Sequence, residues 1–288
     1  MNTSATWTWT RTKWSDFCPG EVTAPIGGPA MNIALPGINK HKYGWIFSPP
    51  YGTMAPTPQM RSRGRIEEME KLCDLLGIRP GITALIGGGG KTTLMYHLAR
   101  ELRQCGTVAV TTTTRIWPPT GIAVAREPDA AREILDRDGL VCLGVPSAQG
   151  KLVSPAFEGW DALADYTLVE ADGSAGKPFK GHEKYEPVLP PRRNTTVLVL
   201  GADGFGRPIS VAAHRPALYA RLAGVPENRP VTPAIAARVA AWEGFHDQVF
   251  VNQVDREDEW PLARQLAEKL DCPVVAGSLR SGYWEKIK

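Results

Sequence analysis

The fold is decided by the stretch Ala84-Leu85-Ile86-Gly87-Gly88-Gly89-Gly90-Lys91-Thr92-Thr93, in which an apolar run breaks into four glycines, a lysine and two threonines. An apolar run before the glycines is typical of a buried strand, and the residues after them are typical of a helix start. Glycines let successive N–H groups curl around an anion, and the following helix presents its positive dipole end to the same anion. The stretch predicts a phosphate-binding loop.

Each polar residue of this stretch has an expected role. Lys91 is expected to reach the β- and γ-phosphates of a nucleotide, and the Thr92 hydroxyl to hold Mg²⁺. The full pattern G-x4-G-K-[ST] places a glycine where this chain has Leu85, so the loop is shortened and begins at Gly87. The alternative is a flexible glycine-rich turn. The residues expected to bind nucleotide here are Gly87, Gly88, Gly89, Gly90, Lys91, Thr92 and Thr93.

Hydrophobic spacing around the glycines predicts an α/β fold. A strand over 82–86, a helix from Leu94 to Leu102 and a strand over 108–110 form a βαβ unit, which requires a parallel sheet. A lead-in helix is predicted from Arg65 to Leu76. Further helices are expected over 128–137, 216–223, 232–242 and 262–270, the third with Thr232 as its N-cap. Further strands are expected over 140–143, 166–170, 197–200, 249–251 and 273–276, the last of which is expected to close the sheet. The predicted architecture is a three-layer sandwich like that of P-loop NTPases, with a mostly parallel central sheet.

Two carboxylates end the strand predicted over 166–170. Glu170 and Asp172 are separated by one residue, so both can face the same side of the strand end, and Gly173 permits a sharp turn. Phosphate-loop enzymes place a carboxylate at such a position to hold Mg²⁺. Asp172 is therefore predicted to bind the metal together with Thr92, and Glu170 to assist it or to orient an attacking water. The alternative is that either residue only caps a turn.

The strand over 108–110 runs into four threonines, Thr111 to Thr114, and then Arg115. Hydroxyls at this strand end can sense the γ-phosphate, for which Thr113 is the candidate, and Arg115 can neutralise charge that develops during transfer. Four threonines in a row are equally good β-strand formers, so a purely structural role stays open.

Asn252 and Asp255 follow a third strand and resemble the N-K-x-D element of GTP-binding proteins. In that element the aspartate accepts two hydrogen bonds from guanine, a donor pair that adenine lacks. The lysine of the element is Gln253 here. A structural alternative makes Asp255 the N-cap of the next helix.

A loop after the carboxylate strand carries many charges, and His214 and Arg215 stand where a later helix begins. The loop lies at the expected nucleotide edge, where it either holds an anionic substrate or partner or is simply solvated; the lone histidine favours a structural role. The charged residues of the loop are Lys177, Lys180, His182, Glu183 and Lys184.

Composition excludes several classes of protein. The formal net charge of +3 leaves only +1 on the 228 residues after residue 60, which is no nucleic-acid signature. Five scattered cysteines form no metal-binding pair, and no apolar run is long enough for a membrane span, so a cytoplasmic protein is expected. Residues 1–60 hold eight prolines and no amphipathic period. They are expected to be disordered or weakly structured. They are either an extension that precedes a true start at Met60 or Met69, or an anchor for a partner. One domain is expected over 61–288.

The motifs in this order resemble the YqeC family of accessory proteins for selenium-dependent molybdenum hydroxylases. The resemblance covers about residues 65–280 and lies in GGGGKTTLMYHLA, VTTTTRIWPP, LVEADGSAGKPFKGHEKYEPVLP, HRP and VNQVD. It implies a P-loop NTPase that acts in the maturation of a molybdenum or selenium enzyme, with a hydroxylase or cofactor-assembly protein as partner.

Three activities are compatible with these residues. The first is Mg²⁺-dependent hydrolysis of GTP or ATP, with Lys91, Glu170, Asp172 and Arg115 as catalytic residues. The second is phosphoryl or nucleotidyl transfer to a small anionic substrate. The third is a nucleotide-gated binding module with negligible turnover.

Overall fold

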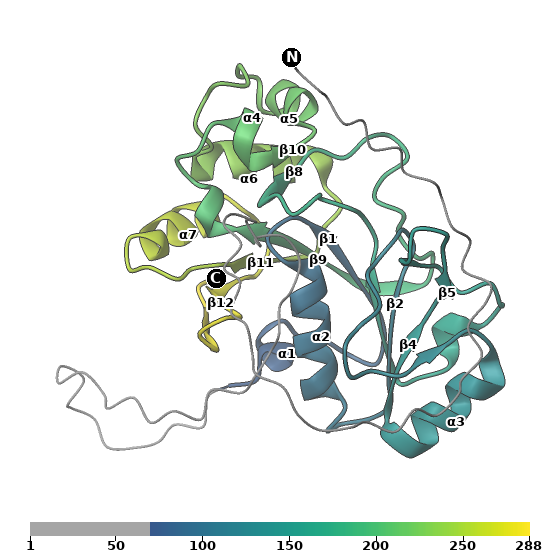
Figure 1. Cartoon of the computed structure of the whole chain (residues 1–288). Coiled ribbons are helices and arrows are strands. Elements are labelled where there is room, and N and C mark those ends of the chain that lie inside the picture. Colours follow the sequence, from purple (N-terminus) through teal and green to yellow (C-terminus); the bar gives the residue numbers. More distant parts are fainter. Residues whose placement is uncertain (1–69) are drawn as a thin grey trace, which may run out of the picture. The chain divides into compact units, whose positions relative to one another are not determined.

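The computed structural model describes residues 70–288, and its centre is a nine-stranded sheet (Figure 1). The strand order is β13-β12-β11-β9-β1-β7-β2-β4-β3. Neighbouring strands run parallel except β12 and the edge strand β13, which are antiparallel. The strands are β1 (Gly81–Gly87), β2 (Val108–Thr112), β3 (Val124–Ala125), β4 (Leu140–Leu143), β7 (Tyr166–Glu170), β9 (Arg193–Gly201), β11 (Gln248–Asn252), β12 (Val274–Ser278) and β13 (Tyr283–Lys286).

The central strands are buried on both faces, as a parallel sheet covered by helices requires. Every residue of β2 and β4 is buried, and so is every residue of β1 and β7 after the first. Alternate residues of a strand point to opposite faces. In β1, Leu85 packs on one side with α2 (Lys91–Leu102), while Ala84 and Ile86 pack on the other.

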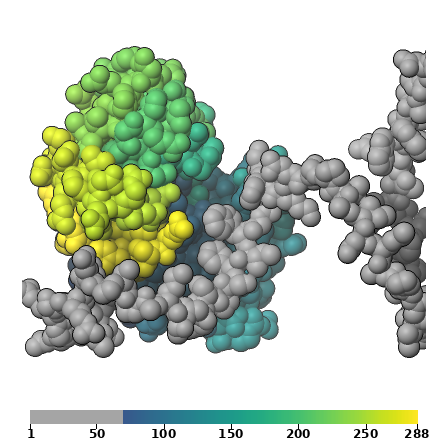
Figure 2. Space-filling view, turned by 60° about the vertical axis from the view of Figure 1, so that its left-hand side comes forward, coloured from purple at the N-terminus to yellow at the C-terminus, as the bar shows by residue number. Residues whose placement is uncertain are grey.

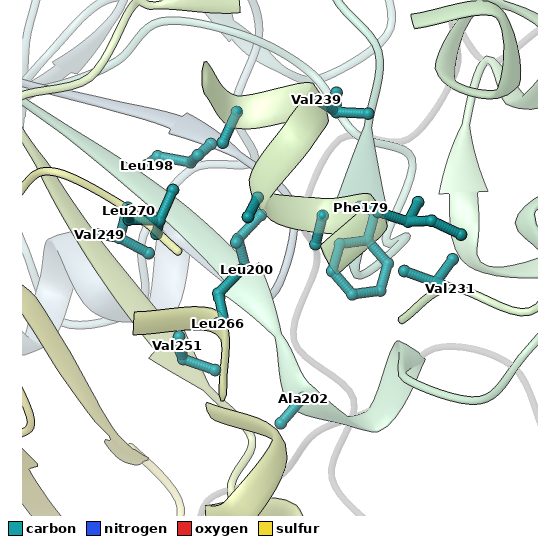
Figure 3. Close-up of a cluster of buried hydrophobic side chains, with 14 of the residues drawn as sticks. Phe179, Leu198, Leu200, Ala202, Val231, Val239, Val249, Val251, Leu266 and Leu270 are labelled. Atoms are coloured by element: carbon teal, nitrogen blue, oxygen red, sulfur yellow. The ribbon is translucent and has the colours of Figure 1, made fainter. Parts of the chain in front are cut away.

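Helices cover both faces of the sheet and make three layers. One face packs against α2 and the short α1 (Leu72–Leu75). The other packs against α3 (Pro128–Asp138) beside β4, and against α5 (Pro216–Ala223), α6 (Pro233–Glu243) and α7 (Glu259–Ala267) beside β9 and β11. Figure 3 shows the larger cluster on this second face, where Leu198 and Leu200 of β9 lie near Val239 of α6. The predicted α/β sandwich with a mostly parallel sheet is thus confirmed.

Short elements complete the chain. Two small sheets pair β8 (Phe179–Lys180) with β10 (Ala213–His214) and β5 (Val145–Pro146) with β6 (Leu152–Val153). The remaining elements are α4 (Ile209–Ala212) and the 3-10 turns η1 (Trp160–Ala162) and η2 (Ala202–Gly204). In Figure 2 the green segment that includes α5 and α6 forms a lobe against the yellow C-terminal segment, in agreement with the packing of α6 on α7. Within residues 70–288, none of the helices has the length and apolar character of a membrane span.

Three local expectations differ from the structure. The predicted lead-in helix is reduced to α1 within the described residues, and its first part, like residues 1–60, lies outside them. The sheet does not end at β12, because β13 adds an antiparallel edge strand. His214 belongs to β10 rather than to a helix, and Arg215, with a φ of +58°, turns the chain into α5. Thr232, in contrast, is the predicted N-cap of α6 and accepts the Ile235 amide.

The topology brings the polar strand ends together. β1 lies between β9 and β7, and β2 lies beyond β7, all in parallel. Because parallel strands end at the same sheet edge, the glycine loop, the two carboxylates, the threonines and Asn252 line one edge, where open α/β sheets bind ligands.

Candidate functional site

The glycine loop between β1 and α2 is tightly packed against other parts of the chain. A side chain at Gly88 would place its Cβ 2.4 Å from the carbonyl oxygens of both Lys177 and Pro178. At Gly89, with a φ of +63°, a Cβ would lie 2.4 Å from the Leu200 carbonyl carbon. The glycines are therefore required by the close approach of protein backbone as well as by any ligand.

The amides of the first three glycines donate hydrogen bonds within the protein. The Gly87 amide donates to Oδ2 of Asp172 (2.8 Å), the Gly88 amide to Val199 O (2.9 Å) and the Gly89 amide to Lys177 O (3.3 Å). All four glycines are predicted from the sequence to bind phosphate. In this conformation the amides left to face an anion are those from Gly90 onward, at the N-terminus of α2, where helical N–H groups have no intrahelical acceptor.

Lys91 is buried at the centre of the site. Its Nζ lies 2.6 Å from Gly87 O, 2.9 Å from Oδ1 of Asp172 and 3.3 Å from the Ser174 hydroxyl. The lysine thus folds back over the glycine loop and forms an ion pair with the carboxylate at the end of β7. Both residues are predicted site residues, and the fold brings them into contact.

Asp172 is the best-connected carboxylate of the site. Nε2 of His182 lies 2.5 Å from its Oδ2, and Lys180 Nζ lies 3.7 Å away. Burial alone would raise the pKa of Asp172, but Lys91, His182 and Lys180 hold it well below its ordinary value. Asp172 is therefore ionised, and both of its oxygens face groups of the protein.

His182 joins Asp172 to Glu243, the last residue of α6. The His182 ring Nδ1 lies 2.8 Å from Oε2 of Glu243, and the His182 amide donates to Oε1 at 2.8 Å. Burial lowers the pKa of His182, but its bonds to Asp172 and Glu243 outweigh burial and raise it. The result is a buried Asp172–His182–Glu243 chain that fixes the position of Asp172.

Thr92 and Glu170 form a second pair beside Lys91. The Thr92 hydroxyl donates to Oε2 of Glu170 at 2.6 Å, and Oε1 of Glu170 lies 4.0 Å from Lys91 Nζ. Burial raises the pKa of Glu170, although Lys91 and the Thr92 hydroxyl act against it. A hydroxyl and a carboxylate so close together are oxygen ligands of the kind Mg²⁺ takes, so this pair fits the metal that the sequence predicts.

The hydroxyls of Thr112 and Thr113 bind backbone oxygens of the protein, whereas Arg115 lies on the surface. The Thr112 hydroxyl donates to Glu170 O (2.8 Å) within the sheet, and the Thr113 hydroxyl donates to Val188 O (2.7 Å). Arg115 is exposed and donates to Gln149, and within residues 70–288 it forms no hydrogen bond or ion pair with the glycine loop. Thr113 thus connects its loop to the segment after β8. Arg115 makes its hydrogen bond to Gln149, away from the glycine loop.

Asn252 reaches the glycine loop from the end of β11. Its Nδ2 donates to Gly89 O at 2.7 Å, and its Oδ1 accepts the Leu279 amide at 3.1 Å. Asp255 accepts a hydrogen bond from Ser278. It does not cap a helix, because α7 begins at Glu259 with Asp258 as the N-cap residue.

Two residues of this network, Glu243 and Ser278, are not predicted from the sequence. Glu243 ends helix α6, 61 positions after His182, and Ser278 ends strand β12, 23 positions after Asp255. Neither stands in a recognisable motif, so only the fold brings them to the site. Lys180, which the sequence analysis placed in a charged loop, is buried and pairs with Glu186 at 3.1 Å.

Comparisons with known proteins find a family match that includes the glycine loop, the threonines and the carboxylates at the end of β7. Residues 83–217 match the model of a family described as "YqeC protein". A relative in Escherichia coli (strain K12), named "Uncharacterized protein YqeC", is 33% identical over 159 residues, which span 51% of this chain and 62% of the relative. The match thus covers less than two thirds of that protein. Among solved structures, the 54 kDa signal recognition particle protein of Aeropyrum pernix K1, in complex with GDP, has a TM-score of 0.34 at 15% identity, over 73% of this chain and 44% of that one.

Proposed function

The chain belongs to the YqeC family, and from this premise we propose that it binds a magnesium nucleoside triphosphate at the glycine loop and hydrolyses it. The family resemblance supports an accessory role in the maturation of a selenium-dependent molybdenum hydroxylase, with that enzyme or a cofactor-assembly protein as partner. The observation that carries the proposal is the position of Lys91, buried beside the glycines at the N-terminus of α2.

The phosphates are bound by the start of α2 in this proposal. The amides from Gly90 to Thr93 face the anion, since those of the preceding glycines donate within the protein. Lys91 exchanges its contact with Asp172 for the β- and γ-phosphates. Asp172 then keeps its hydrogen bond with His182 and its ion pair with Lys180, so the buried carboxylate is not left unpaired when the lysine moves.

Thr92 and Glu170 are the proposed magnesium ligands, Glu170 directly or through water. The sequence predicts Asp172 as the carboxylate ligand of the metal. The contacts of Asp172 with Lys91, His182 and the Gly87 amide favour Glu170 instead. Bound magnesium neutralises charge on the β- and γ-phosphates. In this proposal Glu170 also orients the attacking water, since a carboxylate can accept a hydrogen bond from it.

Lys91→Ala tests the proposal. Isothermal titration with a magnesium-bound non-hydrolysable triphosphate should show binding to the full chain and none to this variant. Lys269→Ala, which makes the same substitution at an exposed lysine outside the site, is the control and should bind normally. Equal affinity of the Lys91→Ala variant would refute the proposal. Phosphate release from GTP and ATP, with and without small anionic acceptors, then separates hydrolysis from transfer and from a module without turnover.

A further inference from the structure

Asn252 connects the phosphate loop to the segment that follows β12. It is buried, and its side-chain amide spans from Gly89 O (2.7 Å) to the Leu279 amide (3.1 Å). A nucleotide whose phosphates bind at the N-terminus of α2 would therefore lie close to the segment that follows β12. The chain between Asn252 and Asp255 turns at Gln253, whose φ of +63° is rare for a residue with a side chain. Such strain is typical of functional sites.

Asp255 is held in one orientation by Ser278. The buried Ser278 hydroxyl donates to Oδ1 of Asp255, while the same oxygen accepts the Arg280 and Ser281 amides, each at 3.2 Å. The serine hydroxyl hydrogen is thus directed at the carboxylate. Asp255 is exposed, and its Oδ2 accepts no hydrogen bond from any residue between 70 and 288. One carboxylate oxygen is fixed and the other is free for a ligand.

Helix capping does not explain this arrangement. The Asp255 and Arg256 amides both donate to Oε2 of Glu259, at 2.9 Å each, so the turn before α7 is stabilised by Glu259. The Asp255 side chain bonds Ser278 instead. A carboxylate that the fold orients at the ligand-binding edge, and that its own turn does not use, is available for recognition.

We propose that Asp255, oriented by Ser278, binds the base of the nucleotide and selects guanine; this rests on the nucleotide binding proposed above. An ionised carboxylate only accepts hydrogen bonds. Guanine offers two neighbouring donors, N1–H and the 2-amino group, whereas adenine offers a bare N1 acceptor at the corresponding position. Pairing a carboxylate with an acceptor leaves both unsatisfied and repels adenine, so one residue attracts one base and excludes the other.

The test uses isothermal titration of the full chain with magnesium and GDP, ADP or xanthosine diphosphate. The wild type should bind GDP about 10- to 100-fold more tightly than ADP, the range for one good bidentate base contact. Asp255→Asn should lose this GDP preference and gain affinity for xanthosine diphosphate, since the asparagine amide can donate to the 2-oxo group of xanthine. Ser278→Ala should weaken GDP binding by less. Asp258→Asn, which removes a nearby exposed carboxylate that pairs with Arg256, is the control and should change nothing.

The outcomes separate the two proposals. Gain of xanthosine diphosphate binding by Asp255→Asn supports the inference and cannot arise from misfolding. If ADP binds as tightly as GDP, and both depend on Lys91, nucleotide binding stands and the guanine assignment is overturned. Unchanged GDP affinity in Asp255→Asn overturns it as well. If the wild type binds neither these three diphosphates nor the non-hydrolysable triphosphate, the proposed function fails and the inference fails with it.

Discussion

Nζ of Lys91 lies 2.9 Å from Oδ1 of Asp172, and both side chains are almost completely buried. The register of the sheet creates this pair: Leu85 of β1 stands beside Glu170 of β7, so the glycine loop begins next to Asp172. The two charges enter the interior together, which avoids the cost of an unpaired buried ion. Lys91, which is expected to bind phosphate, is therefore paired with the Asp172 carboxylate in this structure.

This pairing predicts a strong energetic coupling. Asp172→Asn should lower the free energy of unfolding by about 3–5 kcal/mol, because it leaves Lys91 without its closest counter-charge. The double variant Lys91→Met, Asp172→Asn should lose less than the sum of the single variants. Urea denaturation of the four proteins measures the coupling, and losses that add within about 0.5 kcal/mol would show that the two charges do not stabilise one another.

The buried His182 makes stability depend on pH. Its pKa is raised in the folded protein by Asp172 and Glu243, so its contribution to stability is fully present below the unfolded pKa of 6.5 and is lost as pH rises through the folded value. His182→Asn should therefore destabilise the protein most in acid, with a difference that shrinks toward alkaline pH. Unfolding free energies measured between about pH 5.5 and 9 give this slope.

His246 provides a control of opposite sign. Burial lowers its pKa, so the wild-type protein loses stability at this site as pH falls. His246→Asn should become relatively more stable in acid. If the two variants show the same dependence on pH, the Asp172–His182–Glu243 chain does not hold a charged histidine.

Features that depend on residues close together in the sequence could be predicted, whereas contacts between residues far apart in the sequence could not. The glycine loop, the buried strands and the Thr232 cap each depend on neighbours within a few residues, and each could be predicted. The edge strand β13 is short and half exposed, so its period is weak. The contact of Glu243 with His182 depends on where the end of α6 packs, and that of Ser278 with Asp255 depends on which strand ends lie side by side. Neither arrangement can be predicted from the residues near these positions in the sequence.

Thr92 should be required for the magnesium-dependent part of nucleotide affinity. Thr92→Ala removes the hydroxyl that contacts Glu170 and should weaken binding in excess magnesium by about tenfold or more, while binding in EDTA changes little. Thr92→Ser keeps the hydroxyl and should preserve the magnesium effect. Titrations at several magnesium concentrations measure it, and an alanine variant with full magnesium dependence would remove Thr92 from the metal site.

Gly88 should tolerate no side chain, even though its φ lies outside the left-handed region. Alanine would place its Cβ 2.4 Å from the Lys177 and Pro178 carbonyl oxygens, and these are backbone atoms that cannot rotate away. The segment beneath them is anchored by Phe179, which is fully buried. The variant must either shift this segment or distort the glycine loop, which we expect to cost about 1–3 kcal/mol of unfolding free energy.

Gly173→Ala is the matched comparison for that experiment. Nothing lies within 4 Å of a Cβ at Gly173, and its φ is outside the left-handed region, so alanine should leave the unfolding free energy within about 0.5 kcal/mol. Parallel urea titrations compare the two variants. A large loss at position 88 alone means that the glycines are retained for the packing of Lys177 and Pro178 as well as for an anion. Equal, small losses would mean that the loop can yield, and that ligand binding alone explains its glycines.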